Sequence, residues 1–387
     1  MDNIFHRPEI ATALAGQILQ VSGASASASG LFLAAPRRTG KSTFLREDLR
    51  PELERQGALV LYADLWEDRK ADPGEVIVNA VRGELGRHDG VVARLAKAAG
   101  MDKVNVAGVF TFSLDKVGLA KGVSLTAALA ALSDATAKPI VLIIDEAQHA
   151  ITSSSGTDAL FALKAARDEL NSSRHRGLRV VATGSSRDKL AMLRNSRDQA
   201  FYGAPLIPFP ALDEKYVQWF CERARLPAKL SPRPTFELFK QASFRPEILG
   251  AAVDALRFDF SLAARDVPAR MRQAVQEQID ASNAETLRVI HSLTPIQSAV
   301  LRVVAAKGDA YAPFEAATLQ AYEAVVQATA AAPVNVSEAG VQQALVALQD
   351  KALVWRAARG VYALEEASLA DLMRGEGMLD MVPSSTA

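Results

Sequence analysis

Residues 35–42, Ala-Pro-Arg-Arg-Thr-Gly-Lys-Ser, place cationic and hydroxyl side chains directly behind the apolar run 31–35. This segment matches the pattern G-x-x-x-x-G-K-[ST] at every fixed position except the first, where Ala35 replaces glycine. In such a loop the backbone N–H groups and the N-terminus of the following helix surround phosphate oxygens, and Gly40 lets the chain approach them closely. The segment therefore predicts a site for the phosphates of a nucleoside triphosphate.

The side chains of this loop have distinct predicted roles. Lys41 would contact the β- and γ-phosphates, and Ser42 would ligate magnesium. The competing interpretation is a chance basic turn ahead of a helix, and Ala35 favours it slightly because alanine adopts a positive φ only at a cost. The predicted nucleotide-binding residues of the loop are Pro36, Arg37, Arg38, Thr39, Gly40, Lys41, Ser42 and Thr43.

A second pattern follows roughly a hundred residues later, in the segment PIVLIIDEAQHA (139–150). Its apolar run predicts a buried strand that places Asp145 and Glu146 at its carboxyl end. Asp145 would hold magnesium, directly or through water, and Glu146 would polarise the attacking water. Two acids after a strand can also simply cap the next helix. Together with the phosphate loop, however, they predict an ATPase that uses ATP and Mg²⁺.

Apolar runs at 31–35, 58–64, 139–146 and 178–184 alternate with helical patterns. This alternation predicts a parallel sheet covered by helices on both faces. The stretch 101–124 alternates weakly, which favours an inserted hairpin or edge strand. The predicted fold class is therefore α/β, with a P-loop parallel sheet as the core.

The hydrophobic patterns after residue 210 predict two helical regions. Helical patterns run from about 213 to 290, with proline interruptions, and three further helices follow at 294–307, 313–330 and 337–350. Two short strands around 358–360 complete the elements of a winged helix. The predicted domains are a nucleotide-binding core (1–210), an all-α lid (211–290), a winged-helix domain (291–375) and a flexible tail (376–387).

Composition narrows the class of protein. The chain has 387 residues, which favours two or three domains, and no apolar run long enough to span a membrane. An acid at position 2 and Glu9 argue against an export signal, and a single cysteine, Cys221, favours a reducing cytoplasm. The 44 basic and 44 acidic residues cancel, so no overall field attracts nucleic acid. Five scattered histidines and one cysteine do not form a zinc pattern.

These features together resemble the AAA+ superfamily, in the branch that contains the origin-recognition-type ATPases, the archaeal-ATPase group and the STAND switch ATPases. The PRRTGKS loop, the IIDEAQ strand, the helical lid and the winged helix are each similar to that group, and the resemblance spans nearly the whole chain. In addition, FHRPEI resembles an N-terminal box, F-x-G-R-E, that lies against the adenine. The resemblance thus makes Arg7 a candidate nucleotide contact, although His6 stands where glycine is usual and Pro8 is an insertion.

The resemblance also implies several residues that sense or complete the site. Ser185, after the strand 178–184, stands where the family places a polar sensor of the γ-phosphate; it could equally cap the next helix. Arg197 and Arg194, in a predicted helix before the next strand, resemble an arginine finger that acts on a neighbouring subunit's nucleotide. A solvated helix face is the alternative. Arg245 resembles a second sensor that reaches the phosphates. The alternative is that it is an ordinary surface residue.

Charge argues against DNA as the partner of the winged helix. From residue 291 to the end there are six basic and ten acidic residues, whereas phosphate contacts require clustered cations. The favoured function is a slow ATPase that acts as an AAA+ or STAND-like molecular switch, self-associates through an arginine finger and engages a partner protein. The alternative is an origin-recognition-like ATPase that binds or loads DNA through the winged helix.

Overall fold

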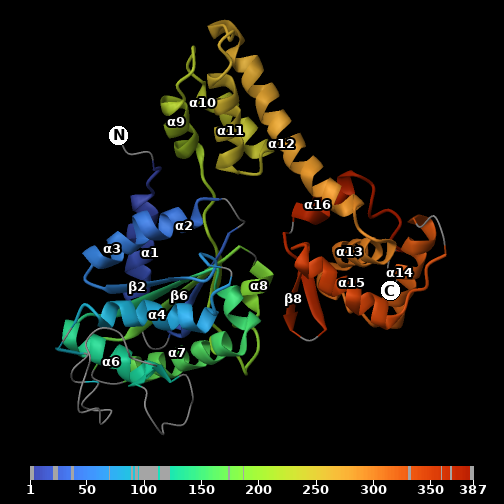
Figure 1. Ribbon diagram of the computed structural model, residues 1–387. Helices are drawn as coiled ribbons and strands as arrows, with labels where there is room; N and C mark the ends of the chain where they lie inside the picture. Colours follow the sequence, from blue (N-terminus) through green and yellow to red (C-terminus); the bar gives the residue numbers. More distant parts are fainter. Residues whose placement is uncertain are drawn as a thin grey trace. The chain divides into compact units, whose positions relative to one another are not determined.

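The computed structural model describes residues 4–20, 25–35, 39–68, 70–88, 90–91, 95, 112–113, 123–172, 175–185, 187–329, 333–358, 360–366 and 368–383. They belong to two compact units, Met1–Ala211 and Leu212–Ala387 (Figure 1). Among these residues, no helix combines the length and the apolar character needed to cross a bilayer.

The first unit is built on a five-stranded sheet in which every neighbouring pair of strands is parallel. The strand order is β2-β5-β6-β1-β7. The four apolar runs of the sequence form the four longest strands, and a short strand adds an edge beside β1. The strands are β1 Leu31–Ala34, β2 Leu59–Asp64, β5 Ile140–Asp145, β6 Leu178–Gly184 and β7 Leu206–Pro208.

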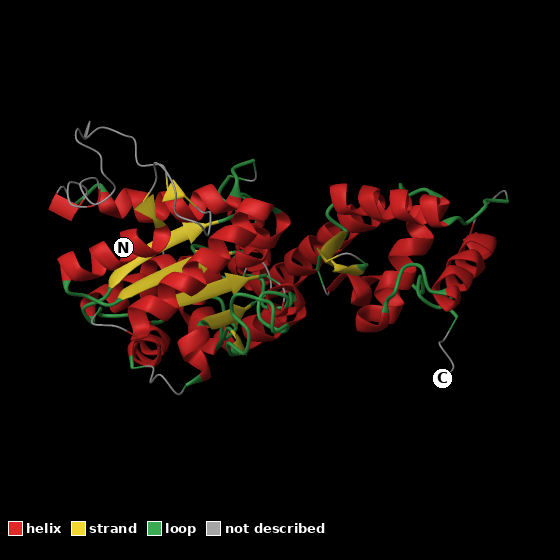
Figure 2. Ribbon diagram, turned by 90° about the horizontal axis from the view of Figure 1, so that it is seen from below, coloured by secondary structure: helices red, strands yellow, loops and turns green. Residues whose placement is uncertain are grey.

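Helices cover both faces of this sheet (Figure 2). Because side chains alternate along a strand, Val141 and Ile143 pack beneath the N-terminal helices, whereas Leu142 and Ile144 pack against the later ones. A continuous run of apolar residues in β5 is what two buried faces require. One layer contains α1 Pro8–Leu19, α2 Lys41–Phe44 and α3 Arg50–Arg55, and the other contains α4 Pro73–Leu85, α6 Leu125–Thr136 and α7 Ser154–Ser172.

The order of the strands determines where a ligand can bind. The chain passes from β1 to β2 at the far edge, returns through β5 and β6, and then crosses to β7 on the other side of β1. Ligands of open parallel sheets bind outside the carboxyl ends of the strands, at such a change of direction. The carboxyl ends of β1, β5 and β6 therefore form the expected site.

The stretch 101–124 contributes only two short strands among its described residues, β3 Phe112–Ser113 and β4 Val123–Ser124. They pair in parallel, in a small sheet of their own. The hairpin considered from the sequence is therefore wrong for these residues, because the strands of a hairpin are antiparallel.

The second unit begins with helices, as the sequence predicted for the lid, and four of them lie between residues 214 and 291. Three of the prolines that interrupt the pattern, Pro232, Pro246 and Pro268, stand in the first turn of a helix. Proline is tolerated there because the first N–H groups of a helix have no partner inside it. The helices are α9 Glu214–Arg223, α10 Pro232–Gln241, α11 Pro246–Arg257 and α12 Val267–His291.

The C-terminal part of this unit has the element order predicted for a winged helix. Thr294 and Gln297 form a capping box that begins α13. Three helices are followed by an antiparallel hairpin, β8–β9, and by a helix that the sequence analysis did not predict. The elements are α13 Pro295–Lys307, α14 Ala316–Thr329, α15 Glu338–Asp350, β8 Val354–Ala358, β9 Val361–Leu364 and α16 Ser368–Gly375.

The predicted flexible tail, 376–387, is packed over part of its length. Met378 is buried in the core of the C-terminal elements, and Leu379 and Val382 pack against the same core. These apolar residues bury surface that a solvated tail would leave exposed. The packed chain therefore extends past residue 376, and residues 384–387 lie outside the described residues.

Candidate functional site

The phosphate-loop segment begins where β1 ends and leads into α2. Gly40 precedes α2 with φ 76°, a left-handed conformation that glycine adopts without a Cβ clash. Ala35, in contrast, continues from the strand: its N–H donates to the Gly184 carbonyl at 3.1 Å, and its φ is not positive. Alanine was expected to cost backbone energy at this position. That expectation is wrong, because Ala35 does not adopt a positive φ.

The other loop residues differ in their burial. Thr39 is buried, Ser42 is half-buried in the first turn of α2, and Thr43 is exposed. The remaining predicted contacts, Pro36, Arg37 and Arg38, lie outside the described residues.

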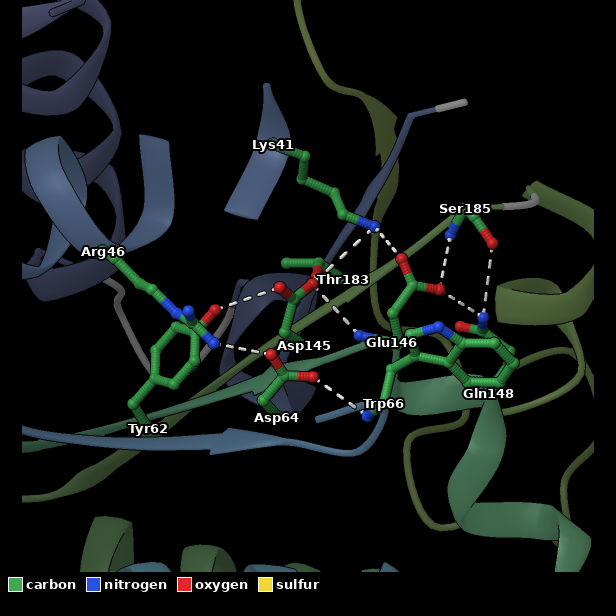
Figure 3. A network of polar contacts seen from close by, with 10 residues as sticks. All are labelled: Lys41, Arg46, Tyr62, Asp64, Trp66, Asp145, Glu146, Gln148, Thr183 and Ser185. Atoms are coloured by element: carbon green, nitrogen blue, oxygen red, sulfur yellow. Dashed lines mark hydrogen bonds and ion pairs between the residues drawn. The ribbon is translucent and has the colours of Figure 1, made fainter. Parts of the chain in front are cut away.

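The lysine of the loop meets both acids of the second motif (Figure 3). Lys41 Nζ lies 2.6 Å from Glu146 Oε1 and 3.7 Å from Asp145 Oδ1. Asp145 ends β5, and Glu146 follows it in a left-handed conformation with φ 53°. Because the carboxyl ends of parallel strands share one edge of the sheet, the two motifs converge there although 105 residues separate Lys41 from Glu146.

The three charges are taken almost completely out of water. The side chains of Lys41 and Asp145 are 5% and 1% exposed, and that of Glu146 is 14% exposed. Buried charges are costly unless they are paired and hydrogen-bonded. Burial by itself raises the pKa of Glu146, but the charge of Lys41 and the hydrogen bonds to this carboxylate outweigh burial and lower that pKa. Glu146 is therefore ionised at neutral pH and able to accept a proton.

Neighbouring strands hold the Asp145 carboxylate in place. The Thr183 hydroxyl in β6 and the Glu146 N–H both donate to Oδ1, the latter at 3.1 Å, and the Tyr62 hydroxyl in β2 donates to Oδ2 at 3.0 Å. Burial, followed by the charge of Asp145, raises the pKa of Tyr62 well above its ordinary value, so its hydroxyl keeps its proton. An anionic oxygen donor is thus fixed at the centre of the edge, where a hard cation could be bound.

Several residues of this network were missed in the sequence analysis. Thr183 is a polar residue near the carboxyl end of β6, a strand whose other polar residue is Arg179, and this break in the apolar pattern was a signal for it. Gln148 follows Glu146 by two residues and is fully buried. Arg46 donates to Asp64 at 2.6 Å, and its guanidinium lies 5.1 Å from the centre of the Tyr62 ring. Their proximity depends on the β2-β5-β6 order, which local patterns do not reveal.

Ser185, the predicted sensor, lies beside Glu146. Its N–H donates to Glu146 Oε2 at 3.2 Å, and its hydroxyl oxygen accepts a longer bond of 3.5 Å from Gln148 Nε2. On the other side of the turn, the His149 ring packs on the Trp66 ring with 4.3 Å between centroids. The polar sensor position and the Glu146 carboxylate are therefore in direct contact.

The two candidate arginine fingers do not lie in a helix. The predicted helix ends early, since α8 spans only Arg187–Ala191. Arg194 and Arg197 follow it in turns, the first half-buried and donating to Asn195 at 3.1 Å, the second exposed. In place of the solvated helix face considered from the sequence, Arg197 is exposed in a turn, whereas Arg194 is half-buried.

Arg245 lies in the second unit, where it precedes α11. Its guanidinium donates to the Ala242 carbonyl at 3.4 Å and to the Ser282 hydroxyl at 3.3 Å. These contacts are within the second unit, and its role as a second sensor stays a prediction.

Arg7, expected against the adenine, is buried beside the helix of the phosphate loop. It donates to the Gly40 carbonyl at 3.2 Å and to the Pro210 carbonyl at 3.1 Å. The guanidinium carbon lies 4.9 Å from the centre of the Phe44 ring and 4.5 Å from that of Phe209. Arg7 therefore connects the N-terminal segment, the phosphate-loop helix and the segment that follows β7.

Replacing Arg7 with alanine should lower the free energy of unfolding of the first unit by about 2–4 kcal/mol, because two hydrogen bonds from a charged group and two cation–π contacts are lost. Urea unfolding measures this change. Arg55→Ala is the matched control, since Arg55 is exposed and donates to Glu52 within its own helix. Equal shifts in the two variants would contradict the connecting role of Arg7.

The chain resembles solved structures of other proteins. No family model matches it, and no curated protein matches it. The Walker-type ATPase Paby2304 of Pyrococcus abyssi has a TM-score of 0.51 at 16% identity, over 96% of both chains. The ORC2 protein of Aeropyrum pernix has a TM-score of 0.55 in its ADP form, at 16% identity over 99% of this chain and 98% of that one. Its ADPNP–ADP complexes give 0.51 at 17% identity, over 97% and 98%.

At these identities a structural likeness shows the fold. The predicted resemblance is confirmed at that level, because the likeness covers nearly the whole of each chain. The parallel five-stranded sheet, the helices on its two faces and the helical region that follows belong to that shared fold. The chain therefore has the fold that the sequence resemblance predicted, which it shares with the ORC2 protein of Aeropyrum pernix and with the Walker-type ATPase of Pyrococcus abyssi.

Proposed function

We propose that this chain binds and slowly hydrolyses ATP, and that it uses the nucleotide as a switch to assemble or to engage a partner protein. One observation carries the proposal. Lys41 Nζ lies within 4 Å of the carboxylates of both Asp145 and Glu146, at the carboxyl edge of an AAA+ sheet. This edge would therefore bring together Lys41 as a cation for the phosphates, Asp145 as an oxygen donor for a metal, and Glu146 as an ionised base.

The ionised Glu146 is suited to be the general base. In hydrolysis the oxygen of water bonds to the γ-phosphorus while the bond from that phosphorus to the bridging oxygen breaks, which yields ADP and phosphate. Glu146 accepts the proton of the water. Lys41 and the backbone of the loop offset the negative charge of the phosphates. Ser185 would link the γ-phosphate to this base, a role that its N–H bond to Glu146 supports.

Magnesium would be held by the Ser42 hydroxyl and by Asp145, and when bound it neutralises charge on the β- and γ-phosphates. Both oxygens of Asp145 already accept hydrogen bonds, from Thr183 and Glu146 on one side and from Tyr62 on the other. This arrangement favours contact through water over direct ligation.

Self-association would supply the remaining charge. Arg197 is exposed on the turn after α8, so it is available to a neighbouring copy of the chain as an arginine finger. Arg194 is the second candidate, since it is only half-buried. Arg245 is proposed as the second sensor of the nucleotide. Because Arg7 already donates to two carbonyls, its proposed contribution is to hold the loop at Gly40 rather than to contact the adenine.

A protein partner is favoured over DNA by the surface of α15, which would be the third helix of a winged helix. Its exposed residues include Ala339, Gln343 and Val346, and its sequence from Glu338 to Asp350 contains no lysine or arginine. Phosphate contacts need cations. The alternative, an origin-recognition-like DNA-binding or DNA-loading ATPase, is supported by the fold shared with ORC2. A cytoplasmic location, expected from the sequence, belongs to the same proposal.

Particle mass tests the switch. We would measure wild type and Glu146→Gln without nucleotide, with ADP, and with ATP and magnesium, each with and without duplex DNA at moderate salt. Because glutamine cannot accept the proton, the variant should keep ATP and assemble in its presence whether or not DNA is added. Assembly only with DNA would favour the loading function. No change of mass with ATP would contradict the switch.

A further inference from the structure

Gln148 makes the closest side-chain contact to Glu146 apart from that of Lys41. It lies in the 3₁₀ turn Ala147–Thr152 and is fully buried. Its Nε2 donates to Glu146 Oε2 at 2.6 Å and to the Ser185 hydroxyl oxygen at 3.5 Å. The side chain thus points from the turn after β5 toward the carboxyl end of β6 (Figure 3).

The end of β6 confines this side chain. A Cβ added to Gly184 would lie 2.4 Å from Gln148 Oε1 and 2.8 Å from the Leu190 side chain, so glycine leaves room for the amide. No donor among the described residues bonds to Oε1. A buried amide oxygen without a donor is costly. The position of the amide is therefore explained by its N–H group, which faces Glu146.

The two oxygens of the Glu146 carboxylate have different donors. Oε1 accepts from Lys41, whereas Oε2 accepts from Gln148 and from the Ser185 N–H. Lys41 is also the residue proposed to contact phosphate, so its three N–H donors would be shared between the phosphate and this carboxylate. If Lys41 turns toward phosphate, Oε2 would keep its two other donors, and Oε1 would become accessible to water.

We propose that Gln148 is a positioning residue for Glu146. Its amide holds Oε2 so that Oε1 is presented to the attacking water, and it links this carboxylate to Ser185 at the end of β6. The inference rests on the proposed hydrolytic function, in which Glu146 is the base. Gln148 itself contacts neither water nor nucleotide in this role.

A donor to a carboxylate stabilises its ionised form, so removal of the donor has a predictable sign. Gln148→Met keeps a side chain of similar length without an N–H group, and Gln148→Glu keeps the shape but adds a like charge. The pKa of Glu146 should be lowest in wild type, higher in Gln148→Met and highest in Gln148→Glu. Carboxyl ¹³C NMR of the free full-length chain measures it, with the Glu146 signal assigned by its loss in Glu146→Gln.

The same variants should change turnover more than binding. In Gln148→Met, kcat should fall about 10- to 100-fold, while KM and the affinity for ATP with magnesium stay within about two-fold. Because Glu146 must be ionised to act, the rate falls as pH decreases through its pKa, and a raised pKa moves this acid limb to higher pH. Gln148→Asn, whose shorter side chain withdraws the amide, should behave like Gln148→Met if the latter folds poorly.

Gln343→Met is the control, because Gln343 is exposed in the second unit and should change neither titration nor rate. A Glu146 titration that is unchanged in both Gln148→Met and Gln148→Asn would overturn the inference, whatever the rate does. A fall in ATP affinity as large as the fall in kcat would also overturn it. If the titration shifts as expected but wild type hydrolyses no ATP, the contact stands and the hydrolytic function fails.

Discussion

Replacing Lys41 with methionine should raise the Kd for ATP by at least about 100-fold, roughly 2.7 kcal/mol. In the proposed site the ammonium group would lie between the phosphates and the carboxylates of Asp145 and Glu146, which are 3.7 and 2.6 Å from it. Without it, the anionic nucleotide would face two buried anions. Titration with a fluorescent ATP analogue in the presence of magnesium measures the change.

The same variant should also be less stable, because the two acids lose their buried partner. Removing one member of a buried ion pair typically costs about 3–5 kcal/mol. Glu146 has a lowered pKa in the folded chain, so its contribution to stability is present above its ordinary pKa and is lost as pH falls through the lowered value. The loss in Lys41→Met should therefore be largest near neutral pH and shrink in acid.

Lys351→Met provides the matched control, since Lys351 is exposed at the end of α15 in the second unit. It should change neither ATP binding nor urea unfolding at pH 7 or pH 4. Lys41→Met that binds ATP as tightly as wild type would show that the phosphates lie elsewhere.

Replacing Glu146 with glutamine should lower kcat by at least about 100-fold, because an amide cannot accept the proton of the attacking water. Binding should survive or improve, since a neutral group replaces a carboxylate beside the phosphates. Steady-state hydrolysis and nucleotide titration on the same samples separate the two effects. Glu54→Gln, at an exposed position of α3, should match wild type in both. Loss of binding together with turnover would contradict the role of base.

Local patterns were sufficient for much of the fold. The apolar runs became strands because a continuous β-branched and leucine-rich segment buries both faces of a parallel sheet. Prolines marked helix starts, as at Pro246, because the first turn leaves N–H groups free. The expectations that failed concerned residues whose structure depends on contacts with distant parts of the chain. Arg194 and Arg197 lie beyond a helix that ends at Ala191, and Met378 packs although its segment looked like a tail.

In the candidate site, too, some features could be predicted from local sequence motifs and others could not. Lys41, Asp145 and Glu146 were predictable because the phosphate-loop and acidic motifs each follow an apolar strand, and parallel strands place such residues at one edge. Ala35 shows the limit of a motif: its cost was expected from the residue type, but the backbone there continues the strand and needs no positive φ.

The sequence by itself determined the two motifs, the class of the fold and the three charges at the centre of the site. Only the tertiary structure decided which side chains hold these charges in place. Tyr62 from β2 and Thr183 from β6 donate hydrogen bonds to Asp145. Gln148 donates one to Glu146. The reason is that strand order places β2 and β6 on either side of β5. Hydrophobic periodicity reports which residues are buried, but it carries no information about which strand lies beside which.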